Sequence, residues 1–217
     1  MHVRAVVAAV PLAFLMAFLS FLLPVMPAAA VPVECLSNGE FTLGYGPDGL
    51  PLGWARFQQG GGASMRWTVD LLSGSAQTAG RPLLSLSALG WQGGPSSPRL
   101  GLRQPVRVVP GQTYRLTLRG DLRCSVGGVP SSSGCGYHPQ WALAPGGGGR
   151  LPPEGAWHTV SLIPAGPGTW RVEHVQTLVP REPLVTLFVA LARVGGPGTE
   201  WAGLTLERVS LVGPGAE

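Results

Sequence analysis

Residues 106–121, with the sequence VRVVPGQTYRLTLRGD, decide the fold, because they predict a strand, a tight turn and a second strand. Pro110 and Gly111 are typical turn residues. In the second strand, one face carries Tyr114, Leu116 and Leu118, and the other carries Thr113, Arg115, Thr117, Arg119 and Asp121. This period of two is typical of a strand with one buried and one exposed face. The stretch therefore predicts a half-buried β-hairpin with an apolar back and a polar front.

The chain after residue 30 repeats this pattern in short segments, which glycine and proline separate, and it shows no sustained helical periodicity. The predicted strands cover residues 35–44, 63–72, 82–89, 100–109, 157–163, 170–178, 184–194 and 201–212. The segment 184–194, LVTLFVALARV, is almost wholly apolar, which predicts a central strand buried on both faces. This spacing favours an all-β fold, either an antiparallel β-sandwich or a jelly roll. Residues 122–155 break the spacing and predict a long loop, which in a compact domain is often functional.

The first 30 residues predict a secretory signal peptide. Arg4 precedes an apolar run over residues 6–25, and alanines at 28–30 offer a small-residue cleavage site. The run approaches the length that spans a membrane, so an uncleaved anchor is the alternative. We expect no membrane insertion after cleavage and a secreted or cell-surface protein. The expected organisation is a signal peptide at 1–30, a folded domain at 31–213 and a disordered tail at 214–217.

Charge and cysteine content narrow the function classes. The formal net charge is +4, and the arginines are scattered along the chain, which argues against a nucleic-acid-binding surface. Cys124 and Cys135 flank a loop rich in glycine and serine, and in an exported chain this pair predicts a disulfide bond. Cys35 is left over and predicts a free or intermolecular thiol.

No motif in the sequence predicts catalysis. The acidic residues are few and form no local pair of the kind that glycoside hydrolysis requires. The spacing of His138, His158 and His174 fits no compact metal-binding motif, and no G-x-S-x-G nucleophile motif is present. We therefore expect a protein that is not an enzyme.

Several short motifs together resemble a known family. In chain order they are Asn38-Gly39-Glu40-Phe41, Gly53-Trp54, Gln104 with the stretch up to Tyr114, Gly168-Thr169-Trp170, the apolar strand at 184–191, and residues 206–211. Their order and spacing resemble carbohydrate-binding modules of the cellulose- and xylan-binding type, over essentially the whole chain after residue 30. The resemblance implies a galactose-binding-like jelly roll and a polysaccharide or glycan ligand.

The resemblance also implies a structural calcium ion between the first and last strands. Glu40 and Glu207 would supply oxygen ligands. However, Thr42 and Arg208 stand where the family carries acidic residues, and Arg208 would oppose a cation.

The candidate ligand-binding residues are loop aromatics and part of the polar row. Trp91, Tyr137 and Trp141 lie in segments predicted as loops, where nothing in the pattern buries them, and an aromatic ring suits stacking on the apolar face of a sugar. Arg115 and Arg119 carry donors that suit sugar hydroxyls or a carboxylate. The other interpretation of this row is a solvated sheet face with cross-strand ion pairs. The remaining tryptophans are expected to pack in the core, namely Trp54, Trp67, Trp157, Trp170 and Trp201.

Two function classes therefore stay open. The first is a secreted, non-catalytic module that binds a polysaccharide or glycan. The second is a structural or adhesion sandwich of the cell envelope, which contacts a protein partner. A small ligand is expected where the polar row meets residues 122–155.

Overall fold

The computed structural model describes residues 31–60, 69–72, 83–89, 98–130, 135–195 and 201–216. The predicted signal peptide at 1–30, Trp67 and Trp91 lie outside these residues. The strands of a larger sheet are β1 (Pro32–Glu34), β3 (Val69–Leu72), β4 (Leu83–Leu89), β6 (Tyr114–Val126), β7 (Val129–Pro130), β10 (Leu162–Gly166), β11 (Thr169–Leu178) and β13 (Trp201–Pro214). The strands of a smaller sheet are β2 (Ala55–Gln59), β5 (Arg99–Arg107), β8 (Tyr137–Pro145), β9 (His158–Thr159) and β12 (Leu184–Arg193).

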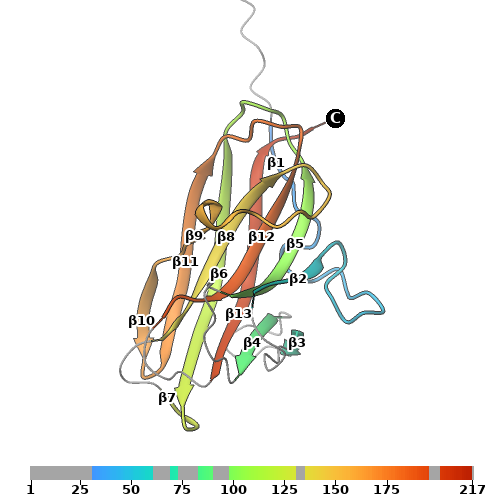
Figure 1. The fold of residues 1–217 in the computed structure, drawn as a ribbon. Coiled ribbons are helices and arrows are strands. Elements are labelled where there is room, and N and C mark those ends of the chain that lie inside the picture. Colours follow the sequence, from blue (N-terminus) through green and yellow to red (C-terminus); the bar gives the residue numbers. More distant parts are fainter. Residues whose placement is uncertain are drawn as a thin grey trace, which may run out of the picture. The chain divides into compact units, whose positions relative to one another are not determined.

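Both sheets are antiparallel, and they pack against each other around one main core (Figure 1). The larger sheet has the order β10-β11-β6-β13-β4-β3, with β1 beside β13 and β7 beside β6. The smaller sheet has the order β2-β5-β12-β8-β9. The predicted all-β, antiparallel sandwich is confirmed. Among the described residues, no helix is long and apolar enough to cross a membrane.

The stretch 106–121 forms a strand end, a turn and a strand, but the predicted hairpin is wrong. β5 pairs with β2 and β12 in the smaller sheet, whereas β6 pairs with β11 and β13 in the larger one. The turn carries the chain from one sheet to the other, and the amide of Gly111 donates to the carbonyl of Pro180 at 2.8 Å. Alternation shows which face of a strand is buried, but it does not show which strand pairs with it.

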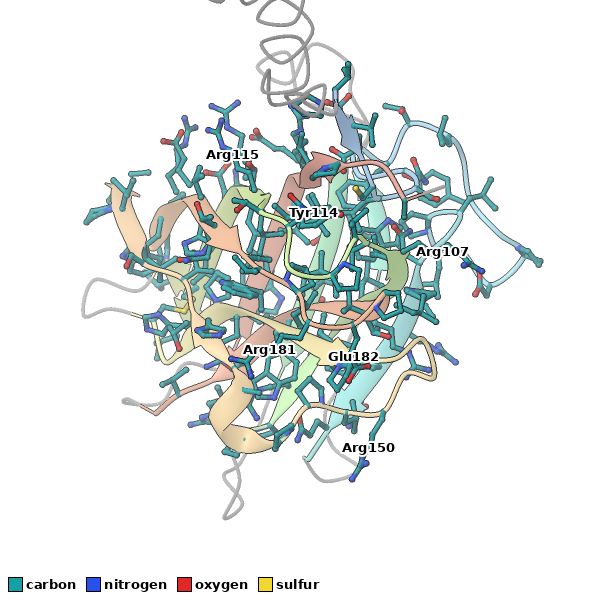
Figure 2. All side chains as sticks on the ribbon, turned by 90° about the horizontal axis from the view of Figure 1, so that it is seen from above. Arg107, Tyr114, Arg115, Arg150, Arg181 and Glu182 are labelled. Carbon is teal, nitrogen blue, oxygen red and sulfur yellow. A yellow bond between two sulfur atoms is a disulfide. The ribbon has the colours of Figure 1, made fainter. Side chains whose placement is uncertain are left out.

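The inward row of β6 anchors the main core. Tyr114, Leu116 and Leu118 are buried, as the alternation predicts. The hydroxyl of Tyr114 accepts a bond from the amide of Val109 at 2.7 Å and donates to the carbonyl of Pro214 at 2.9 Å. One side chain therefore ties the sheet-to-sheet connection to the end of β13. Figure 2 shows Tyr114 between the sheets and Arg115 pointing outward.

β12 is the central strand of the smaller sheet, as predicted, and it is buried on both faces. Leu187 lies in the main core, whereas Phe188 points to the other side of the sheet. There Phe188 packs with Phe57 and Trp157 in a second apolar cluster, with ring centroids 5.0 and 6.0 Å away. The smaller sheet therefore has an apolar layer on each side.

Several predicted boundaries are wrong. Residues 122–155 are not one loop, because β6 continues to Val126 and β8 occupies Tyr137–Pro145. Residues 35–44 form turns instead of a strand, since Asn38 and Phe41 adopt positive φ angles of 53° and 59°. Residues 157–163 divide between β9 and β10, which lie in different sheets. β13 reaches Pro214, one residue into the predicted tail.

The predicted disulfide between Cys124 and Cys135 is confirmed, with Cα atoms 5.8 Å apart. Cys124 belongs to β6 of the larger sheet, and Cys135 precedes β8 of the smaller sheet. The bond therefore links the two sheets. Cys35 is a free thiol, and burial raises its pKa.

Candidate ligand-binding face

The polar row of β6 lies on the outer face of the larger sheet, between β11 and β13. Strand pairing sets Arg115, Thr117 and Arg119 beside one outward residue from each neighbouring strand. The three rows across the strands are Thr177–Arg115–Val212, Val175–Thr117–Ser210 and Glu173–Arg119–Arg208. Because ladders on both sides of β6 fix its backbone, these side chains start from defined positions.

A groove of about 380 Å³ opens on this face. Its lining residues are Arg115, Thr117, Arg119, Val175, Arg208, Ser210 and Val212. They combine three guanidinium groups and two hydroxyls with two valine side chains, and they include no carboxylate. The structure thus brings the predicted site residues Arg115 and Arg119 together in one open groove, although the sequence did not reveal Arg208 as their neighbour.

The arginines of the groove differ in their partners. Neither Arg115 nor Arg119 forms an ion pair with a carboxylate among the described residues. Arg208 Nη1 lies 3.6 Å from Glu40 Oε1, and both side chains are partly exposed. The Nε atom of Arg208 is buried and has no hydrogen-bond acceptor within the described part of the chain.

The carboxylate of Glu34 supports the groove from the adjacent strand β1. It accepts a bond from the hydroxyl of Ser210, and also from the amides of Leu36 at 3.1 Å and Leu211 at 2.8 Å. These three bonds occupy the Glu34 oxygens. Glu34 therefore holds Ser210 and β13 in place and is not directed at the arginines.

Two of the predicted aromatic contacts are not at the surface. Tyr137 and Trp141 lie on β8 and are 0% and 2% exposed, so the prediction that they sit in an open loop is wrong. Trp141 Nε1 donates to His174 Nε2 at 3.0 Å, and its ring stacks on His158 at a centroid distance of 4.3 Å. The sequence did not predict β8, because the segment contains Pro139 and Pro145 and proline is rare inside strands.

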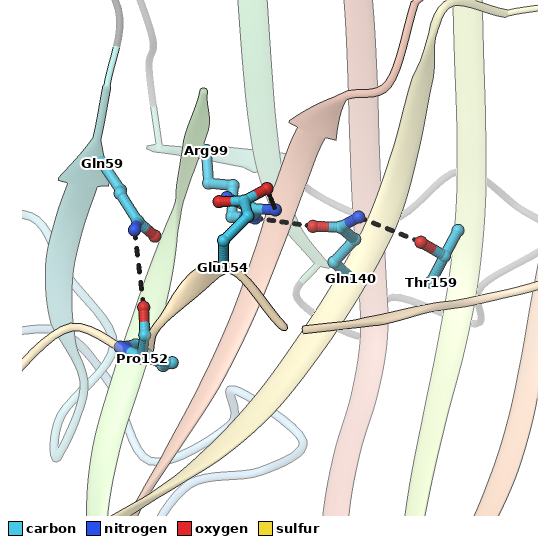
Figure 3. A network of polar contacts seen from close by, with 6 residues as sticks. All are labelled: Gln59, Arg99, Gln140, Pro152, Glu154 and Thr159. Atoms are coloured by element: carbon cyan, nitrogen blue, oxygen red, sulfur yellow. Dashed lines mark hydrogen bonds and ion pairs between the residues drawn. The ribbon is translucent and has the colours of Figure 1, made fainter. Parts of the chain in front are cut away.

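Residues 146–157, which include the 3-10 turn Glu154–Ala156, lie against part of the outer face of the smaller sheet. Arg99, only 2% exposed, forms two bonds of 2.6 and 2.7 Å to Glu154 and one of 2.7 Å to Gln140 (Figure 3). Gln140 donates to Thr159 at 2.9 Å, and Gln59 donates to the carbonyl of Pro152 at 3.4 Å. The bonds from Arg99 lower the pKa of Glu154.

Arg99 also lies over the ring of Trp157, with its Cζ atom 4.8 Å from the ring centroid. The sequence did not single out Arg99, because its partners are far away along the chain. This network holds residues 146–157 over the smaller sheet. Within the described ranges, the polar groove lies on the outer face of the larger sheet.

The two predicted calcium ligands do not lie in a ligand cluster. Glu40 pairs with Arg208, and Glu207 lies exposed at a bulge in β13 between Leu206 and Arg208. Over the described ranges, no group of three or more His, Cys, Asp or Glu side chains could hold a metal ion. This donor set gives no support to calcium binding, which stays a prediction.

Comparison with known proteins identifies only distant structural likeness. No family model and no curated protein matches the chain. The arabinose-bound α-L-arabinofuranosidase MgGH51 is 17% identical, with a TM-score of 0.50 over 84% of this chain and 27% of that chain. TmCBM61 in complex with β-1,4-galactotriose is 13% identical, with a TM-score of 0.39 over 82% of this chain and 97% of that chain.

A structure described as CBM4 is likewise 13% identical, with a TM-score of 0.39 over 82% of this chain and 99% of that chain. The match to the arabinofuranosidase covers 27% of that protein, so this chain spans about a quarter of its length. At 17% identity, that likeness concerns the fold alone.

Proposed function

We propose that this protein is a non-catalytic glycan-binding module that holds a polysaccharide on the outer face of its larger sheet. The observation that carries the proposal is the open groove in which Arg115 and Arg119 have no ion-pair partner in the described part of the chain. Guanidinium and hydroxyl groups suit the hydroxyls of a sugar, and exposed valine side chains such as Val175 suit its C–H surface. The groove offers both kinds of contact side by side.

The position of the groove also favours binding. β6 is hydrogen-bonded to β11 and β13 along most of its length, so a ligand does not need to order the backbone. Binding sites on such rigid elements lose less conformational entropy than sites on loops. Only the arginine side chains would be ordered when a ligand binds.

Affinity electrophoresis through gels that contain single polysaccharides tests the proposal. At least one polysaccharide should retard the wild-type protein, and Arg119→Ala should weaken that retardation about ten-fold or more, as expected for loss of a charged hydrogen bond. Arg107→Ala is the matched control, because Arg107 is an exposed arginine of the smaller sheet. The proposal fails if no polysaccharide retards the wild-type protein, or if both variants behave alike.

We further propose that the protein is exported and works outside the cell or on its surface. The disulfide between Cys124 and Cys135 supports an oxidising compartment. Mass spectrometry of protein recovered from the culture medium or the cell surface should find an N-terminus just after Ala30. Recovery of the full chain from the cytosol with both thiols reduced would argue against export.

A specific observation favours the second function, contact with a cell-envelope protein. An apolar groove of about 510 Å³ lies between β8 and the covering segment, with Leu143, Leu151 and Pro152 among its lining residues. If a cell-envelope protein binds in this groove, the immobilised wild-type protein should capture that partner from solution. Leu151→Asp should abolish this capture and leave the polysaccharide retardation unchanged. Unchanged capture would reject this role for the groove.

A further inference from the structure

The groove on the larger sheet carries an imbalance of charge. We propose that it selects an acidic glycan, a polysaccharide whose carboxylate or sulfate groups bind Arg115 and Arg119. This inference rests on the proposed function and deepens it, since it names the chemical class of the sugar.

The bulge in β13 creates this imbalance. From Trp201 to Leu206, the pairing of β13 with β6 is in one register, and from Arg208 onward it is shifted by one residue. If the first register continued, Glu207 would stand opposite Arg119 and could pair with it. The shift instead sets Arg208 beside Arg119.

Two like charges in directly opposed positions destabilise a sheet. Arg119 and Arg208 occupy such positions. Glu173 stands opposite Arg119 on β11 but forms no ion pair with it among the described residues, and Glu40 lies 3.6 Å from Arg208 in a partly exposed pair. An exposed pair of this kind contributes little to stability. A bound anionic group would offset the repulsion between the two arginines. Bulges are frequent beside binding sites, where they redirect a side chain.

The spacing along β6 favours a polymer over a single small anion. Arg115 and Arg119 are four residues apart on the same face, so their Cα atoms are about 13 Å apart along the strand. Between them, Thr117 and its neighbour Val175 form an uncharged stretch of groove. A chain with acidic groups at intervals and neutral sugar surface between them matches this order.

The border of the groove argues against nucleic acid. Glu173 stands opposite Arg119, and Asp121, 3.6 Å from Arg171, lies two residues further along β6. A nucleic acid carries a charge about every 1.7 Å of duplex, so these carboxylates would repel it. The residues that line the groove also include no aromatic ring on which a base could stack. The sparser charge of an acidic glycan avoids these carboxylates.

Isothermal titration with soluble glycans tests the inference. The probes are partly methyl-esterified polygalacturonate, its full methyl ester, sparsely sulfated dextran and unmodified dextran, at fixed salt concentration. The wild-type protein should bind the carboxylated chain at least about ten-fold more tightly than its neutral ester, or the sulfated chain at least about ten-fold more tightly than dextran. The first result assigns carboxylate as the acidic group, and the second assigns sulfate.

Three variants make the test specific. Arg119→Gln should lose at least about ten-fold in affinity for the acidic chain, as expected for loss of a charge-assisted bond. The affinity of Arg119→Lys should lie between those of Arg119→Gln and the wild type, because lysine keeps the charge but lacks the planar guanidinium group. Arg107→Gln should stay within about two-fold in affinity, because Arg107 is an exposed residue of β5 in the smaller sheet, whereas Arg115 belongs to β6 in the larger sheet. Equal thermal melting of the three variants would show that each is folded.

The outcomes separate this inference from the proposed function. Equal binding of acidic and neutral chains, with a loss in Arg119→Gln, would overturn the inference and leave glycan binding standing. Absence of binding to every glycan, including those of the wider gel screen, would overturn both. DNA that binds as tightly as the acidic glycan, with equal losses in Arg119→Gln and Arg107→Gln, would show general polyanion binding and also overturn the inference.

Discussion

At the scale of single residues, Gly120 determines how closely β6 and β13 approach each other. A Cβ atom at this position would lie 2.0 Å from the carbonyl oxygen of Thr205. The close approach occurs directly beside the bulge that brings Arg208 next to Arg119. The absence of a side chain at position 120 therefore helps to shape the charge pattern of the groove.

Gly120→Ala should lower the free energy of unfolding by about 1–3 kcal/mol, because backbone atoms must move to admit the methyl group. Denaturant titration measures the change. Gly148→Ala is the control, because a Cβ atom there meets nothing within 4 Å, and its effect should stay within about 0.5 kcal/mol. Equal stability of the two variants would contradict the packing described for Gly120.

Sequence alternation identified Arg115 and Arg119 as outward residues, because a period of two holds along an undisturbed strand. It could not identify Arg208, since the bulge breaks that period one residue earlier. It also could not identify Arg99 as buried, because burial of an arginine depends on a partner that only the folded chain brings near. What stayed hidden at this scale was pairing between distant segments.

At the scale of elements, β8 and β11 close one edge of the sandwich through a pair of histidines. Trp141 of β8 donates to His174 of β11, and His158 of β9 stacks on the same indole ring. This bond requires an unprotonated Nε2 on His174. Burial, and then the nearby charge of His158, lower the pKa of His174, and burial also lowers the pKa of His138.

Acid should therefore destabilise the fold. The folded protein holds His138 and His174 neutral, whereas the unfolded chain protonates them near pH 6.5, so the unfolded state binds more protons below that pH. The stabilisation that these neutral histidines provide is complete above about pH 6.5. It is lost as the pH falls toward their lowered pKa values in the folded protein. Thermal melting at pH 7.5 and 5.5 measures this loss. His174→Gln keeps an acceptor but does not titrate, so its melting should depend less on pH; an unchanged dependence would exclude His174 as a cause.

Reduction of the disulfide should lower stability by about 3 kcal/mol, as expected for opening a loop with a sequence separation of 11. The link joins β6 to the segment that enters β8, so its loss should loosen that connection before the main core. Denaturation with and without a reducing agent measures the effect, and Cys124→Ser/Cys135→Ser should reproduce it. A midpoint that does not move on reduction would refute this role.

Most strands were predictable at this scale because alternation or a long apolar run marks them. β8 was not predictable, since it contains two prolines and no clear alternation of apolar and polar residues. Its pairing with the distant strand β12 stabilises it. The segment 35–44 was misleading for the opposite reason. Its apolar residues pack into the core from turns, where Phe41 is buried at a positive φ angle.

At the scale of the whole molecule, β12 is shared by two apolar layers. Leu187 packs into the main core, and Phe188 packs into the second cluster beneath residues 146–157. The loss of either layer should therefore affect the whole smaller sheet. The run at 184–194 predicted this double burial, but it could not predict what covers the second face.

Leu187→Asp and Phe188→Asp should each abolish cooperative melting, because an unpaired buried charge costs several kcal/mol and a domain is stable by only about 5–15 kcal/mol. Circular dichroism during heating measures this. Ile163→Asp is the control, because Ile163 is 48% exposed on β10, and it should melt like the wild type. Cooperative melting of both core variants would reject β12 as the shared strand.

The turn at Pro110–Gly111 has a consequence for how the chain folds in time. The turn sends consecutive strands to different sheets. β5 therefore pairs with β12, and β6 pairs with β13, both of which come much later in the sequence. Contacts between distant segments slow folding to milliseconds or seconds. Until the last strands arrive, both sheets expose unpaired edges, which is a state prone to aggregation. We therefore expect productive folding to begin only after the whole chain, including β12 and β13, has been synthesised.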